Sequence, residues 1–109
     1  PYSQAIMVDG VLFTSGQIPL NPATGSVAGS DIETQTEQVM RNLSAVLKEA
    51  GMDFENVVKT TCFIANMEYF SAFNQIYSKY FVSKPARSCV EVSRLPKNVL
   101  VEVELIAKK

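Results

Sequence analysis

The chain has 109 residues, of which 47% are hydrophobic, and its 10 basic and 11 acidic residues give a net charge of -1. This length supports one compact domain over residues 1–109 and leaves no room for a second. Charges of both signs are spread along the chain, so nucleic-acid binding is disfavoured. The absence of histidine excludes Ser-His and Cys-His nucleophile pairs, ordinary zinc sites and the usual general base at neutral pH.

No apolar run approaches the roughly 20 residues that a membrane-spanning helix needs, so we expect a soluble protein without a membrane partner. The two cysteines, Cys62 and Cys89, lie in apolar, strand-like runs and have no Cys-x-x-Cys spacing. This pattern is typical of reduced, buried thiols and indicates a cytoplasmic protein.

The first half of the chain predicts a β-hairpin, a structured loop and a helix. Two strand-like runs, residues 5–8 and 11–15, flank an Asp-Gly pair that favours a tight hairpin turn. Prolines and glycines interrupt residues 16–30, which predicts a loop. Ser30 and Glu33 form a capping-box pattern, and apolar residues recur at helical spacing from there until Gly51.

The second half predicts a strand, a helix and two further strands. The β-branched run 57–65 alternates, and Asn66 can cap a helix that ends at residues 83–85. The aromatic residues of this helix follow the helical period, which favours packing on a sheet over a ring-stacking ligand site. The last two strands are expected to form a hairpin turned by residues 94–98. The order ββαβαββ predicts an α+β fold with a single-layer sheet and two helices on one face.

Side-chain alternation in the last two strands predicts a polar sheet face. The valines of both strands are assigned to the core beneath the helices. The opposite face would then display an arginine, a thiol and three carboxylates: Arg87, Cys89, Glu91, Glu102 and Glu104. Leu100 and Ile106 belong to the same set, which indicates that this face is partly buried, and a partner subunit is the simplest cover.

The register of the expected hairpin follows from charge. One register sets Glu91 against Glu102, and two like charges opposite each other are destabilising. A shift by two residues pairs Arg87 with Glu104 instead, and we prefer it for that reason.

Arg87 then has two interpretations. From spacing alone, a structural ion pair with Glu104 is favoured over an anchor that grips a carboxylate ligand at two points. For Glu102, a solvated or interface carboxylate and a residue that positions water are equally favoured. Cys89 is expected to be a small buried packing residue rather than a nucleophile, because Arg87 is its one basic neighbour.

Several stretches resemble the RidA (YjgF) family of small trimeric proteins. They follow the family order over essentially the whole chain, and the Pro-Ala-Arg-Ser stretch at 85–88 is highly specific. The stretches are residues 1–5, 15–20 and 58–61, Asn74 with Tyr77, residues 85–92 with Leu95-Pro96, and Glu102.

This resemblance implies a chorismate-mutase-like fold and a homotrimer with the helices outside and a site in each cleft between subunits. It implies hydrolysis of reactive enamines and imines, such as 2-aminoacrylate and 2-aminocrotonate, to 2-keto acids and ammonia. Such intermediates escape from pyridoxal-phosphate enzymes. No cofactor or metal is implied, and the expected small-molecule partner is a 2-imino or 2-keto acid.

The resemblance also implies roles for particular residues. The arginine that grips the substrate carboxylate falls on Arg87, and the glutamate that handles water falls on Glu102. Five further positions match the pocket, with Cys89 contributing its main chain: Tyr2, Ser15, Gly16, Phe81 and Cys89. The family commonly carries several residues before the position of Pro1. If that extension orders the pocket, the site around Tyr2 is looser without it.

Two other functions compete with this one. The first is a non-catalytic regulatory module that binds 2-keto acids or other small carboxylates. The second is RNA cleavage or translation inhibition, with which some members of the family are credited. The acidic balance, the absent histidine and the lack of a basic aromatic patch argue against an RNA substrate.

Overall fold

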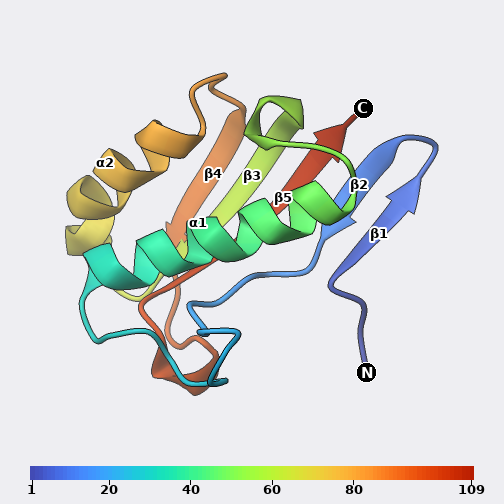
Figure 1. Ribbon diagram of the computed structural model, residues 1–109. Helices are drawn as coiled ribbons and strands as arrows, with labels where there is room; N and C mark the ends of the chain where they lie inside the picture. Colours follow the sequence, from blue (N-terminus) through green and yellow to red (C-terminus); the bar gives the residue numbers. More distant parts are fainter.

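Two helices lie on one face of a five-stranded sheet in the computed structural model, which describes residues 1–109 (Figure 1). Three short 3₁₀ helices lie in the connections. The strands and helices, in chain order, are β1 (Ala5–Val8), β2 (Val11–Thr14), α1 (Ile32–Glu49), β3 (Val57–Ile64), α2 (Phe70–Tyr80), β4 (Ala86–Glu91) and β5 (Val101–Lys108). The predicted α+β class and the order ββαβαββ are therefore confirmed.

Local sequence explains how the first elements begin. Asp9 and Gly10 both have positive φ angles, 51° and 78°, which suits the tight turn between β1 and β2. Helix α1 is capped by Asp31, whose carboxylate accepts a hydrogen bond of 2.8 Å from the Thr34 amide. The predicted cap at Ser30 is wrong by one residue, because the helix begins at Ile32 and the Asp31 carboxylate reaches the third helical amide.

The predicted hairpin between the last two strands is wrong. The strand order is β1-β2-β5-β3-β4, with β4 parallel to β3 at the sheet edge and β5 antiparallel to both β2 and β3. The connection from β4 carries the chain past β3, so β5 has hydrogen-bonded neighbours on both sides. Arg87 lies opposite Thr60 and Glu104 lies opposite Thr61, so the expected Arg87–Glu104 pair does not exist.

The parallel pairing also reverses the predicted face of β4. Thr60 and Cys62 of β3 are buried beneath the helices, and their partners on β4 are Arg87 and Cys89. Glu91, the next residue on that side, accepts a hydrogen bond from the Met67 amide in the segment that precedes α2. The arginine, the thiol and Glu91 therefore point to the helix side.

Glu102 and Glu104 of β5 do lie on the open face, as predicted. They alternate with Val101, Val103 and Leu105, which are buried beneath the helices. Only two of the five residues assigned to the polar face thus lie on it.

The core lies between the sheet and the two helices. Helix α1 buries Val39, Met40, Leu43 and Leu47, and α2 buries Phe73, Ile76 and Tyr77. Tyr77 stacks on Phe81 with 4.3 Å between ring centroids. The prediction that the aromatic stripe of the second helix packs on the sheet is confirmed. Neither helix combines the length and the hydropathy needed to cross a membrane.

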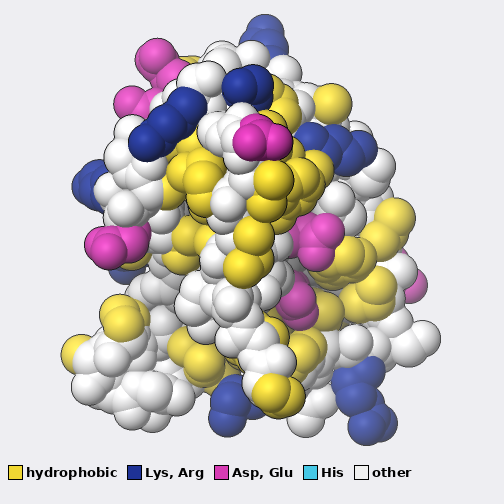
Figure 2. All heavy atoms as spheres, turned by 90° about the vertical axis from the view of Figure 1, so that its right-hand side faces the viewer, with side chains coloured by type: hydrophobic (Ala, Val, Ile, Leu, Met, Phe, Trp, Pro, Cys, Tyr) yellow, Lys and Arg dark blue, Asp and Glu magenta, His cyan; other side chains and the backbone are white.

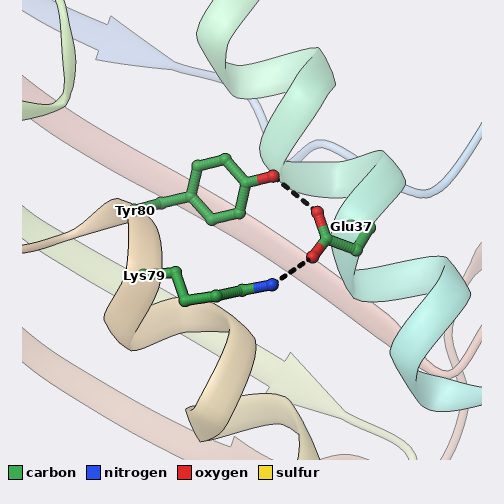
Figure 3. Close-up of polar contacts among 3 residues, drawn as sticks. All are labelled: Glu37, Lys79 and Tyr80. Atoms are coloured by element: carbon green, nitrogen blue, oxygen red, sulfur yellow. Dashed lines mark hydrogen bonds and ion pairs between the residues drawn. The ribbon is translucent and has the colours of Figure 1, made fainter.

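A polar contact joins the two helices on their outer side. The Glu37 carboxylate of α1 accepts hydrogen bonds from the Lys79 ammonium, at 2.8 Å, and from the Tyr80 hydroxyl of α2 (Figure 3). Both bonds stabilise the charged form, so the pKa of Glu37 is lowered. This is the one ion pair in the structure.

Neither helix covers the opposite face of the sheet (Figure 1). Ile6, Val8, Phe13 and Val90 are between 43% and 51% exposed on it. Figure 2 views the molecule from the side of β1 and β2, where hydrophobic side chains run down the middle and charges of both signs are dispersed. The open face is apolar enough to fit another protein surface.

Candidate functional site

Arg87 is the second residue of the edge strand β4 and points into the space between the sheet and α2. Its guanidinium carbon lies 4.6 Å from the ring centroid of Tyr77 and 5.3 Å from that of Phe70. Its Nη1 donates a hydrogen bond of 2.7 Å to Oδ1 of Asn74. No carboxylate forms an ion pair with it. Aromatic rings and a neutral amide therefore hold the guanidinium in place and leave its charge available to an anion.

A pocket of about 590 Å³ opens beside this guanidinium. Its lining contains two cationic side chains and no carboxylate: Asn74, Tyr77, Ser78, Phe81, Val82, Lys84, Pro85 and Arg87. The volume falls in the range of small-molecule sites. Phe81, a predicted pocket residue, thus shares this cavity with Arg87.

The ring beneath the arginine is held from the sheet. The Tyr77 hydroxyl and the hydroxyl of Thr60, which is fully buried on β3, form a hydrogen bond of 2.7 Å. The pKa of Tyr77 is raised by burial. Thr60 also lies directly opposite Arg87 in the pairing of β3 with β4. The same residue therefore positions the Arg87 backbone and holds the Tyr77 ring on which the guanidinium rests.

Glu102 is positioned by a different part of the chain. Gln17 and Val103 exchange two backbone hydrogen bonds, of 2.8 and 3.1 Å, which bring Gly16 against the Glu102 side chain. A Cβ atom at position 16 would lie only 1.9 Å from Oε2 of Glu102. Burial and the neighbouring charge of Glu104 raise the pKa of Glu102. A side chain at position 16 would therefore displace the Glu102 carboxylate, which binds protons more readily than usual.

The predicted pocket residues near the N-terminus lie around Gly16 and not around Arg87. Tyr2 and Gly16 line a cavity of about 310 Å³, and the Tyr2 side chain is 76% exposed. The Ser15 hydroxyl donates a hydrogen bond to the Ser3 carbonyl. The Ser15 side chain thus holds the segment that carries Tyr2.

Within one chain, the two groups of residues are separate. Arg87 lies opposite Thr60 on one side of β3, and Glu102 lies opposite Phe63 on the other. Their Cα atoms are about 14 Å apart, from two strand spacings and three residue rises, and their side chains leave opposite sheet faces. The prediction that both share one face is wrong.

Comparison with known proteins identifies the family. The model of the family described as Endoribonuclease L-PSP matches residues 1–109. The chain belongs to this family. It is the RidA (YjgF) family that the sequence resembles.

Two relatives in this family carry different names. One is the Lactococcus lactis protein "Putative regulator AldR", 62% identical over 99% of this chain and 86% of its own length. Another is "Reactive Intermediate Deaminase A, chloroplastic" of Arabidopsis thaliana, 45% identical over 98% of this chain and 58% of its own length. Among solved structures, E. coli TdcF with bound serine is 37% identical, with a TM-score of 0.95 over 100% of this chain and 88% of its own.

Sequence reasoning assigned no separate role to Asn74, Lys84 and Thr60 around the arginine. Asn74 precedes Tyr77 by three residues on α2 and interrupts its aromatic face, a signal that a polar group is needed at that point. Thr60 gives no such signal, because threonine is ordinary in a strand.

Cys89 lies half-buried on the Arg87 side, beside Cys62. No cluster of three or more cysteine or carboxylate side chains is placed to hold a metal ion.

Proposed function

We propose that this protein hydrolyses small 2-imino acids, formed from enamines such as 2-aminoacrylate and 2-aminocrotonate, to 2-keto acids and ammonia. The observation that carries the proposal is the Arg87 guanidinium, which has no acidic partner and lies in a pocket of about 590 Å³. The deaminase named among the relatives and the serine bound by TdcF both support a small amino-acid-like ligand.

In the proposed reaction, Arg87 binds the substrate carboxylate at two points, with Asn74 keeping the guanidinium oriented. The enamine takes a proton at C3 and becomes an iminium ion, the protonated imine, whose C2 is electrophilic. A water molecule attacks C2 as Glu102 accepts one of its protons, which gives a neutral tetrahedral carbinolamine. Glu102 returns that proton to the amino group, and the C–N bond breaks as the C=O bond forms. The hydroxyl proton passes to the departing ammonia, so ammonium and the 2-keto acid leave.

This mechanism requires two copies of the chain, because Arg87 and Glu102 of one copy leave opposite sheet faces. We propose a homotrimer in which Arg87 of one subunit and Glu102 of its neighbour line the same cleft. The exposed hydrophobic residues of the open sheet face support such an assembly, since packing against another subunit would remove them from water. The raised pKa of Glu102 makes its carboxylate a stronger proton acceptor than an ordinary glutamate, which suits a general base.

The direct test is a coupled assay in which 2-aminoacrylate is generated in place and pyruvate is measured. Arg87→Ala should lower kcat/KM by at least about 100-fold, because the substrate loses its orientation. Arg87→Lys should recover only part of the loss, since an ammonium lacks the planar fork. Arg94→Ala, at an exposed arginine outside the pocket, is the matched control. Wild-type rates in a folded Arg87→Ala protein would refute the proposal.

Mixed oligomers test whether the site is shared. Arg87→Ala and Glu102→Gln chains, each inactive alone, would be co-expressed with different tags, and the mixed species purified. In a mixed trimer one cleft regains both groups, so activity should return to about one third of the wild-type value. No recovery in a verified mixed trimer would show that the two residues do not share a cleft.

A regulatory carboxylate-binding module is the second candidate. It is favoured by the name of the relative with 62% identity, and it would use the same Arg87 pocket. Calorimetry with pyruvate and 2-oxobutyrate separates the two functions. Micromolar binding that requires Arg87, in a protein without imine turnover, would support the regulatory module over the deaminase.

A further inference from the structure

Cys62 and Cys89 form a pair of thiols on neighbouring strands. They are direct partners in the parallel register of β3 and β4, so both side chains leave the same face of the sheet. Both are free thiols, Cys62 fully buried and Cys89 half-buried. The pair was not anticipated from the sequence, where 27 positions separate the two residues.

The spacing of the strands suits a disulfide. Neighbouring strands lie about 4.8 Å apart, and disulfides join residues whose Cα atoms are about 4.4 to 6.8 Å apart. A bond between the two sulfurs therefore needs rotation about the side chains and little displacement of the backbone. The Cys62 thiol also lies 3.9 Å from the Thr60 hydroxyl, to which it donates.

The two thiols differ in acidity, which assigns them different chemical roles. The contact with the Cys62 thiol and the charge of Arg87 outweigh burial and lower the pKa of Cys89 to about 7. The pKa of Cys62 is raised by its contact with Cys89 and by burial. The charged or titratable groups around the pair are Arg87 on β4 and Tyr77 on α2. Cys89 is thus the thiolate that reacts first, and Cys62 is its protonated neighbour.

We propose that Cys62 and Cys89 are an oxidation site, at which a hydroperoxide converts the two thiols into a disulfide within one chain. The Cys89 thiolate attacks the peroxide, the O–O bond breaks, and Cys89 becomes a sulfenic acid while the other oxygen leaves as an alcohol or water. The Cys62 sulfur then attacks the Cys89 sulfur. The S–O bond breaks, and water leaves with the Cys62 proton.

The test of this proposal uses mass rather than turnover, so a failure of the proposed deaminase activity would not change its outcome. Purified wild-type protein is treated with hydrogen peroxide, and its intact mass and thiol content are measured under denaturing conditions. We expect a chain that has lost two hydrogens and both alkylatable thiols, runs as a monomer on a non-reducing gel, and is restored by dithiothreitol. A digest should contain one peptide pair joined through Cys62 and Cys89.

Variants at Cys62 provide the control. Cys62→Ala and Cys62→Val cannot form the bond, so Cys89 should instead gain two or three oxygen atoms, which dithiothreitol does not remove. Using both substitutions guards against a packing defect, and circular dichroism checks the fold of each. The proposal is overturned if wild-type Cys89 gains oxygen while Cys62 stays alkylatable. It is also overturned if the disulfide joins two chains or if neither thiol reacts.

Discussion

The pocket beside Arg87 (the Arg87 pocket) and the region where Glu102 lies against Gly16 (the Glu102 corner) differ in how their charged groups are held. Arg87 rests on two aromatic rings and a neutral amide at a sheet edge, so its positive charge is available to a ligand. Glu102 sits on a central strand, pressed against Gly16, and its pKa is raised by burial and by a like charge. One region suits an anion, and the other suits proton transfer. Neither region completes a reaction alone, which is why the proposed site needs two subunits.

The largest expected effect comes from a substitution that displaces the Glu102 carboxylate but leaves residue 102 itself unchanged. Gly16→Ala places a methyl group where Oε2 lies, so the flexible carboxylate must move. We expect kcat to fall by about 100-fold or more, the loss of a positioned general base, with little change in melting temperature. Steady-state kinetics and thermal unfolding measure the two effects.

A double variant tests whether Gly16→Ala acts through Glu102. In a Glu102→Ala chain, Gly16→Ala should cause no further loss of kcat, because the displaced carboxylate is already absent. Additive losses would mean that Gly16 acts on the reaction through some other group.

A smaller effect is expected in the Arg87 pocket when its neutral partner is removed. Asn74→Ala deletes the 2.7 Å bond to the guanidinium and should raise KM by about tenfold. Asn74→Asp should be worse, because a carboxylate would pair with Arg87 and compete with the substrate. Gln75→Ala, on the exposed side of the same helix, is the control. An Asn74→Asp variant that binds better than Asn74→Ala would contradict the idea of an anion site.

The Glu102 corner should also set the pH dependence of turnover. A general base acts when deprotonated, so the rate should fall as the pH drops through the raised pKa of Glu102. Glu104→Gln removes the repelling charge and should move this acid limb to lower pH. The pH profile of kcat/KM measures the shift. An acid limb that moves upward, or stays unchanged, would argue against Glu102 as the base.

The smallest effect is expected at a residue that belongs to neither region. Glu37→Gln weakens the bonds between α1 and α2 and should cost about 0.5 to 1 kcal/mol at pH 7, with kcat/KM unchanged. Because the pKa of Glu37 is lowered in the folded state, its contribution is present above the unfolded pKa. It is lost as the pH falls through the folded pKa. The free energies of unfolding of the two proteins, measured in urea, should therefore converge at acid pH. A difference that does not change with pH would exclude the carboxylate as the cause.

Local pattern was sufficient for much of the fold. The Asp9-Gly10 turn, the helical spacing of Val39, Leu43 and Leu47, and the aromatic face of α2 all specify short-range structure, and all three lie where the sequence predicted. The Pro-Ala-Arg-Ser stretch and its companions were likewise sufficient to indicate the family, which the comparison confirms. Each turn, helix face or motif is formed by residues that are close together in the sequence.

Strand order was decided only by the tertiary structure. Alternation states which residues share a face of one strand, but it does not state which strand lies beside it. Two consecutive strands favoured a hairpin, yet β5 inserts between β2 and β3, where both its edges find hydrogen-bond partners. That single change turned Arg87 toward the helices, away from Glu102, and set Cys89 beside Cys62. Residue identity therefore predicted the chemistry of the site, whereas long-range pairing decided which of those residues can meet.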